Sequence, residues 1–366
     1  MLDNTPNLRG FDVFAFTFSS TITLGVAFLP YVADGEIQSA WLKLIATSIP
    51  YFFMLWLLAT YFRLYGNTDF FMELKKKGGS FVYLIVTVYL TISAIFSTMK
   101  VTQDLTFLVR TFMLKTTSTL LILIPFILLI SLAVSAGLLT IIRFICIFVI
   151  AEILLIGAFV IYGFFSEYFN WIYILPMIDV NFPTFLKSSL SDAARYGGVV
   201  TLLGLMQYVK KEEKIFGAMS LGLFFIMAIY VSQSLVVLGV FGFKEAINLT
   251  SPILTLAQSI TPGTGLLERM DLLLLGFWII SFIKIACILF WFSLYLLEQL
   301  FPKIKKIVFI FLITPFFFIY AIVVPFQFVD QWQFYNINVL IASFVMPSIL
   351  LIYLNIRAKK SQGQSL

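Results

Sequence analysis

The stretch SSTITLGVAFLP, residues 19–30, decides the fold because it places polar residues inside the first long apolar segment. Its hydroxyl residues, among them Thr23, precede Gly25 and a closing proline. A membrane-spanning helix is expected to be strongly apolar at this depth. Unwinding a helix in lipid is tolerated only where the freed backbone groups face protein, water or a ligand. The stretch therefore predicts a helix that is broken at mid-depth to build a small-molecule site.

The composition of the chain indicates an integral membrane protein. Of its 366 residues, 61% are hydrophobic and only 11% are charged, and the mean hydropathy is +1.03. Soluble domains are nearer to about one-quarter charged, so this chain has too little polar surface to face water. The absence of histidine excludes a histidine proton switch or a histidine metal site. The two cysteines both lie in apolar runs and predict no disulfide.

The hydropathy pattern predicts an all-α protein with ten membrane spans, because about 20 apolar residues cross a bilayer as a helix. The first run is expected to be a retained helix, because a signal-peptide pattern does not precede it. The predicted spans are 11–33, 39–63, 80–106, 117–136, 138–163, 190–209, 215–241, 270–299, 307–325 and 335–356.

The distribution of Lys and Arg predicts that both termini are cytoplasmic. Tight basic clusters, such as Lys75–Lys77, Lys210–Lys214 and Lys303–Lys306, all fall on the side that the termini share. They are topology signals and predict no nucleic-acid site. The long connections on the other side, 164–189 and 242–269, are apolar enough to predict short interfacial helices.

A second segment looks interrupted in the same way as the first. The stretch YGGVVTLLG, residues 196–204, lies in the sixth predicted span, five spans after the first. Gly-interrupted segments in corresponding positions of two halves are typical of transporters built from inverted repeats. The sequence thus predicts one domain, with repeat one at about 11–163 and repeat two at about 190–356. A cytoplasmic tail at 357–366 would follow, and its stretch KKSQGQSL, residues 359–366, is expected to be disordered.

The small residues in these two segments also have a simpler explanation. Glycines, serines and threonines in membrane helices often only allow two helices to pack closely. Hydroxyl groups can also bond to carbonyls of their own helix. The matching positions in the first and sixth spans favour a binding site over packing alone.

Two ionisable residues lie in the middle of predicted spans, where such residues are functional candidates. Glu152 is either a structural partner or a proton or cation carrier. Lys284 shares a helical face with Cys287 and Trp291 and can pair with Glu152 or with acidic groups nearer the outer end, Glu268 and Asp271. It can also take the place of a coupling cation.

The third predicted span offers another wall for a pocket. Ser93, Ser97, Lys100, Val101 and Asp104 lie along one helical face. Lys100 and Asp104 are one turn apart, so an ion pair within the helix is the simplest interpretation of their charges.

Catalytic and cofactor motifs are not found in the sequence. It contains no P-loop, no Gly-rich dinucleotide motif, no set of metal ligands and no nucleophile with an adjacent base. We therefore expect a protein that is not an enzyme and that needs neither a metal nor another cofactor.

Three stretches carry a resemblance to a known family. They are TLGVAFLP in the first span, YGG in the sixth, and above all ERMDLLLLGFWIISFIK at residues 268–284. Over nearly its whole length the chain resembles the B subunits of spore germinant receptors of endospore-forming bacteria. That family is similar to the amino acid–polyamine–organocation superfamily. The resemblance implies a leucine-transporter-like fold with broken helices 1 and 6.

The resemblance also implies a role and a set of partners. A B subunit is expected to bind a germinant, often an amino acid, and to act with an A-type membrane subunit and a C-type lipoprotein in the spore inner membrane. The pocket residues that it implies are Thr23, Gly25, Ser97, Val101, Gly198, Val199, Cys287 and Trp291. Two alternatives remain: an amino-acid transporter coupled to protons through Glu152, and a structural subunit with a vestigial pocket.

Overall fold

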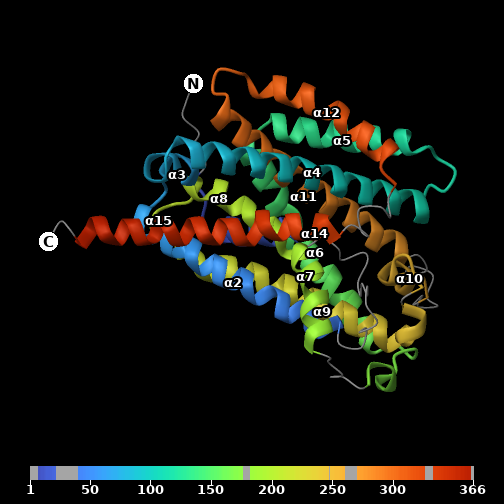
Figure 1. Ribbon diagram of the computed structural model, residues 1–366. Helices are drawn as coiled ribbons and strands as arrows, with labels where there is room; N and C mark the ends of the chain where they lie inside the picture. Colours follow the sequence, from blue (N-terminus) through green and yellow to red (C-terminus); the bar gives the residue numbers. More distant parts are fainter. Residues whose placement is uncertain are drawn as a thin grey trace.

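The computed structural model describes residues 7–21, 40–175, 182–246, 248–259, 270–325 and 333–363. In these ranges the chain is helical, and only an isolated bridge between Leu8 and Val209 has β-type pairing. The helices pack side by side in one bundle, with α5 and α12 along one side and α2 and α9 along the opposite side (Figure 1).

Seven helical stretches in the described ranges are long and apolar enough to cross a membrane. They agree with seven of the predicted spans, because apolar length alone determines such helices. They are α2 (Ala40–Tyr65), α4 (Ser80–Phe112), α6 (Leu138–Phe164), α9 (Ile215–Ala246), α11 (Met270–Leu300), α12 (Lys306–Val323), and the stretch Tyr335–Lys360 within α14 (Gln333–Leu340), η5 (Ile341–Val345) and α15 (Met346–Gly363).

The fourth predicted span is an apolar helix of 17 residues, α5 (Thr119–Ser135). It is followed at once by α6, and the turn between them contains Gly137 with a φ of +98°. Only glycine adopts this backbone conformation at little cost. A second glycine with a positive φ, Gly79 at +87°, separates the short helix α3 (Phe70–Gly78) from α4.

The first and sixth predicted spans are not continuous α-helices. Helix α1 runs from Gly10 to Ser19, and residues 22–39 lie outside the described ranges. The sixth segment begins at α7 (Phe182–Ala193), eight residues before the predicted start at 190. From there it changes to the 3₁₀-helix η3 (Ala194–Thr201), the single turn α8 (Leu202–Leu205) and the short η4 (Met206–Tyr208). The segment over 190–209 is therefore interrupted, as the sequence predicted, and the interruption takes the form of tighter 3₁₀ turns.

The C-terminal end also differs from the prediction. Helix α15 continues to Gly363, so residues 359–363 of the stretch expected to be disordered are helical. This part of the chain has no proline before the final glycine and carries Arg357, Lys359 and Lys360, which favour the C-terminal end of a helix. Both long connections contain short helices, as expected: η2 (Trp171–Ile174) and α10 (Pro252–Ser259).

Two of the basic clusters lie close to residues near the ends of the chain. Leu8 donates its backbone N–H to the carbonyl of Tyr208 at 2.8 Å, which places Leu8 beside the start of the cluster at 210–214. The Tyr353 hydroxyl donates to the Lys77 carbonyl at 2.8 Å. Figure 1 shows α3 and the C-terminal end of α15 at one end of the bundle, and α10 at the opposite end.

Helix α11 is at the centre of the bundle. It packs against α4, α5 and α6. Of the 18-residue apolar stretch of α11, 67% is buried inside the structure, compared with 28% of the corresponding stretch of α12. Side chains on α11 therefore face other helices on most sides, whereas α12 leaves most of its surface for lipid or a partner.

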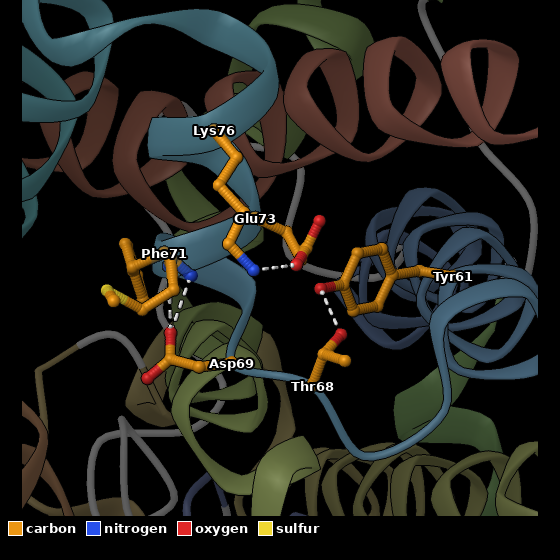
Figure 2. A network of polar contacts seen from close by, with 7 residues as sticks. Tyr61, Thr68, Asp69, Phe71, Glu73 and Lys76 are labelled. Carbon is orange, nitrogen blue, oxygen red and sulfur yellow. Dashed lines mark hydrogen bonds and ion pairs between the residues drawn. The ribbon is translucent and has the colours of Figure 1, made fainter. Parts of the chain in front are cut away.

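Asp69 links α11 to the turn between α2 and α3. One of its carboxylate oxygens accepts the backbone N–H groups of Phe71 and Met72 at 2.8 and 3.1 Å, which caps α3 (Figure 2). The other accepts from the Tyr295 hydroxyl at 2.7 Å and from Gln299 Nε2 at 2.8 Å. The carboxylate thus joins two helices that are far apart in the sequence.

The replacement Asp69→Ala is expected to lower the free energy of unfolding by about 2 kcal/mol, because it removes a helix cap and a charged acceptor together. Thermal unfolding of the purified protein in detergent measures the change. Lys76→Ala is the matched control, since the Lys76–Glu73 pair on the same helix leaves the lysine side chain 66% exposed. Equal effects of the two variants would contradict the role of Asp69.

Candidate functional site

The end of α1 forms the first side of the candidate site. Two of its hydroxyls bond within the helix: Thr17 Oγ1 donates to the Val13 carbonyl and Ser20 Oγ to the Thr17 carbonyl. These bonds agree with the simpler explanation for the polar residues. Ser19 Oγ is buried and has no hydrogen-bond partner among the described residues. The hydroxyls therefore only partly bond within their own helix.

Gly198 on η3 lies directly against this end of α1. A Cβ atom at Gly198 would lie 1.7 Å from the carbonyl oxygen of Ser20 and 2.6 Å from its carbonyl carbon. Any residue other than glycine would have to push the two segments apart. The two interrupted segments predicted from the sequence thus meet backbone to backbone.

Three buried tyrosines surround this contact. Their rings lie in a row, with 5.8 Å between the centroids of Tyr51 and Tyr196 and 5.6 Å between those of Tyr196 and Tyr230. Tyr230 donates its hydroxyl to the Thr21 carbonyl at 2.8 Å, and Tyr51 donates to the Ala193 carbonyl at 2.9 Å. Thr21 lies two residues beyond the end of α1, and Ala193 is the last residue of α7. The tyrosines therefore hold the backbone on both sides of the interruption.

The tyrosines were not among the predicted site residues. Their signal in the sequence is a hydroxyl-bearing ring inside an apolar span, because a buried tyrosine usually needs a hydrogen-bond partner. The sequence does not identify that partner, since the carbonyls lie on segments far away in the chain.

Tyr230→Phe is expected to lower the free energy of unfolding by about 1 kcal/mol, because the Thr21 carbonyl loses its donor while the ring stays in place. Thermal unfolding in detergent measures this loss. Tyr162→Phe is the control, since Tyr162 lies on α6 and is 40% exposed. A Tyr230 variant as stable as the control would show that this bond does not support the end of α1.

A buried charge cluster joins α6 to α11. Lys284 Nζ contacts one carboxylate oxygen of Glu152, and the Ser281 hydroxyl donates to the other. Glu152 is 1% exposed and Lys284 is fully buried. Of the pairings that the sequence allowed for Lys284, the structure contains the one with Glu152; Glu268 lies outside the described ranges. The positive charge of Lys284 and the negative charge of Glu152 therefore cancel each other inside the bundle.

The residues predicted as a third wall lie on α4. Val101 is buried and Ser97 is half-buried, and α4 packs closely against α11. Lys100 Nζ lies 2.5 Å from Asp104 Oδ1, so these two charges form the expected pair within the helix.

The remaining predicted pocket residues are distributed over two elements. Val199 is buried on η3, and Cys287 and Trp291 are buried on α11, which packs against η3. The Trp291 ring makes an edge contact with Phe16 of α1 at 6.0 Å between centroids. Thr23 and Gly25 lie outside the described ranges. The structure thus brings α1, η3 and α11 together.

The arrangement offers backbone carbonyls, aromatic rings and neutralised charges. Among the described residues there is no group of three or more His, Cys, Asp or Glu side chains that could hold a metal ion.

The family of the chain follows from comparison with known proteins. The model of the family described as spore germination protein matches residues 7–329. This range includes both interrupted segments, the buried charge cluster and the tyrosine row. No curated protein matches the chain. Together with the membrane helices, the match indicates a transporter-like membrane protein with a role in germination. The chain belongs to the spore germination protein family.

Proposed function

We propose that this chain senses a germination nutrient by binding a small molecule, an amino acid, where α1 ends against η3, and that it signals to partner subunits. The observation that carries the proposal is the backbone contact between Gly198 and Ser20. Carbonyl groups at the C-terminal end of a helix carry partial negative charge and suit an ammonium group. In a protein of the spore germination family, such a site fits a receptor for a zwitterionic nutrient.

The fold that we propose has ten membrane segments in two inverted repeats, as in leucine-transporter-like proteins. The seven long helices, α5 and the two interrupted segments supply these ten segments. The interrupted segments are five apart, which fits a repeat of five with opposite orientations. We place both termini in the cytoplasm, because two of the basic clusters lie close to residues near the ends of the chain.

The partners that we propose are an A-type membrane subunit and a C-type lipoprotein in the spore inner membrane. Binding would bias a conformational equilibrium in the complex, and a shift from mostly one state to mostly the other requires about 5 kcal/mol of differential binding. The interrupted segments are suited to move, because 3₁₀ turns and helix ends can absorb changes in backbone torsion.

The experiment uses spores that lack this chain, complemented with the wild type. Germination is followed against a panel of amino acids, sugars and nucleosides. We expect one nutrient response to be lost in the deletion and restored by the wild type. If no response depends on the chain, the receptor proposal fails.

A second candidate is a proton-coupled amino-acid transporter, and the buried Glu152 is the observation that favours it. Uptake of labelled amino acids into vesicles that contain only the purified chain distinguishes the two. A receptor binds without accumulation, whereas a transporter accumulates the solute along a proton gradient. A structural subunit with a vestigial pocket shows neither.

A further inference from the structure

Gln233 is a buried side chain whose polar atoms are unused. It lies on α9 with 0% exposure, and among the residues that the structure describes neither its Nε2 nor its Oε1 has a hydrogen-bond partner. A primary amide offers two donors and one acceptor, and native proteins pair the great majority of buried polar atoms. Leaving both polar atoms of the amide unpaired lowers the free energy of unfolding, and no hydrogen bond in the folded protein compensates for this loss. Such a residue is expected where a bound molecule supplies the partner.

The position of Gln233 on α9 places it at the interrupted end of α1. Nearer the N-terminal end of α9, a Cβ atom at Gly222 would lie 3.0 Å from the Phe14 carbonyl oxygen, so this part of α9 packs on α1. Tyr230 lies two turns further along α9 and donates its hydroxyl to the carbonyl of Thr21. Thr21 is the last described residue of the first segment. Gln233 follows Tyr230 by three residues, so the two side chains are neighbours on one face of α9. Gln233 is therefore one turn beyond the point where α1 stops.

Two other unpaired polar atoms lie on the same pair of helices. Ser19 Oγ at the end of α1 and Ser234 Oγ on α9 are both fully buried and have no hydrogen-bond partner within the described ranges. Ser234 follows Tyr230 by four residues and so shares its face. Around one tyrosine, the packed helices α1 and α9 thus present unused donors and acceptors in an otherwise apolar interior.

The chemistry of an amide selects its partner. A carboxylate only accepts hydrogen bonds, so it would leave Oε1 of Gln233 unpaired, and an ammonium group only donates, so it would leave Nε2 unpaired. A carboxamide donates and accepts in one plane and can satisfy both atoms. The surroundings also favour a neutral group, because Arg195, whose charge acts on Tyr230, is paired with Asp192 at 2.8 Å.

We propose that Gln233 is a specificity-determining residue that pairs with a side-chain carboxamide of the bound amino acid. This inference rests on the proposed function, in which the backbone at the end of α1 holds the ammonium group. A site built to hydrogen-bond a polar group strongly rejects an analogue without that group. Asparagine and leucine have nearly the same shape, so they form a matched pair of probes.

The test measures binding of radiolabelled L-asparagine and L-leucine to the purified full-length chain in detergent. We expect the wild type to bind asparagine at least about tenfold more tightly than leucine. Gln233→Met keeps the length of the side chain and is expected to remove this preference. Its unfolding temperature should equal or exceed that of the wild type, because no paired polar atom is lost.

Gln299→Met is the control for a half-buried glutamine with a structural role. Gln299 donates to Asp69, so its replacement should lower the unfolding temperature and leave the preference for asparagine unchanged. The inference is overturned if the wild type binds leucine as well as asparagine, or if Gln233→Met keeps the preference. It is also overturned if Gln233→Met only destabilises the protein, as expected of a glutamine that binds internal water.

Failure of this inference can be told from failure of the proposed function. If the wild type binds neither amino acid but spores still need the chain to respond to another nutrient, the carboxamide inference fails and the receptor function stands. If the wild type binds asparagine but no nutrient response of spores depends on the chain, the role of Gln233 stands and the receptor function fails.

Discussion

Lys284→Met is expected to lower the free energy of unfolding by about 3–5 kcal/mol, because removal of one partner leaves the other charge buried without compensation. Glu152 would retain only the Ser281 hydroxyl as a described partner, at a position that is 1% exposed. Glu152→Gln should have an effect of similar size, since it leaves the fully buried Lys284 facing a neutral amide. Thermal unfolding of the purified chain in detergent measures both effects.

The double variant Glu152→Gln with Lys284→Met is the decisive control. Without either charge, the interior has no uncompensated ion, so the double variant should recover most of the stability that each single variant loses. Additive losses would show that the two side chains do not act as a pair. Single losses below about 1 kcal/mol are typical of a solvated pair, and would place these charges in contact with water.

Gly198→Leu is expected to abolish the nutrient response of spores while the protein still inserts in the membrane. The Cβ atom alone would lie 1.7 Å from the Ser20 carbonyl oxygen, so α1 and η3 cannot keep their contact. Overpacking of this kind costs about 3 kcal/mol or more where backbone must move. Germination at matched protein level, measured by immunoblot of spore membranes, reports the loss.

Gly157→Ala is the matched control for this replacement. Gly157 lies within the membrane helix α6, and a Cβ there would meet nothing within 4 Å. The response should remain, and the helix should become slightly more stable, since alanine has the higher helix propensity. A normal response of the Gly198→Leu spores at normal protein level would show that the contact with Ser20 is not part of the site.

The regular part of the fold could be predicted from the sequence, because it depends on apolar length alone. The helices α6 and α9, for example, begin at the predicted residues, 138 and 215. The interruptions were also visible, since YGG and the hydroxyl-rich stretch after residue 18 are unusual in lipid. Their exact form was not, because the choice between an α-helix and the 3₁₀ turns of η3 depends on packing against α1 and η5.

The candidate site was predictable only where a residue type is unusual by itself. Glu152 and Lys284 stand out because charges are costly in a membrane, and the structure pairs them. Tyr51 and Gln233 stand out less, since neither side chain is charged. Their importance depends on which atoms lie opposite them, and helices α2, α7 and α9 meet only after folding.

The pairing of Leu8 with Val209 has a mechanical consequence for the two interrupted segments. Two hydrogen bonds, from Leu8 N–H to the Tyr208 carbonyl and from Lys210 N–H to the Leu8 carbonyl, join them at Leu8 and Val209, which are both buried. The two segments come into contact again at Ser20 and Gly198. A segment pinned at two points cannot swing independently of its neighbour. The first segment and the latter half of the sixth therefore move together, so that a force on Leu8 acts on both halves of the protein.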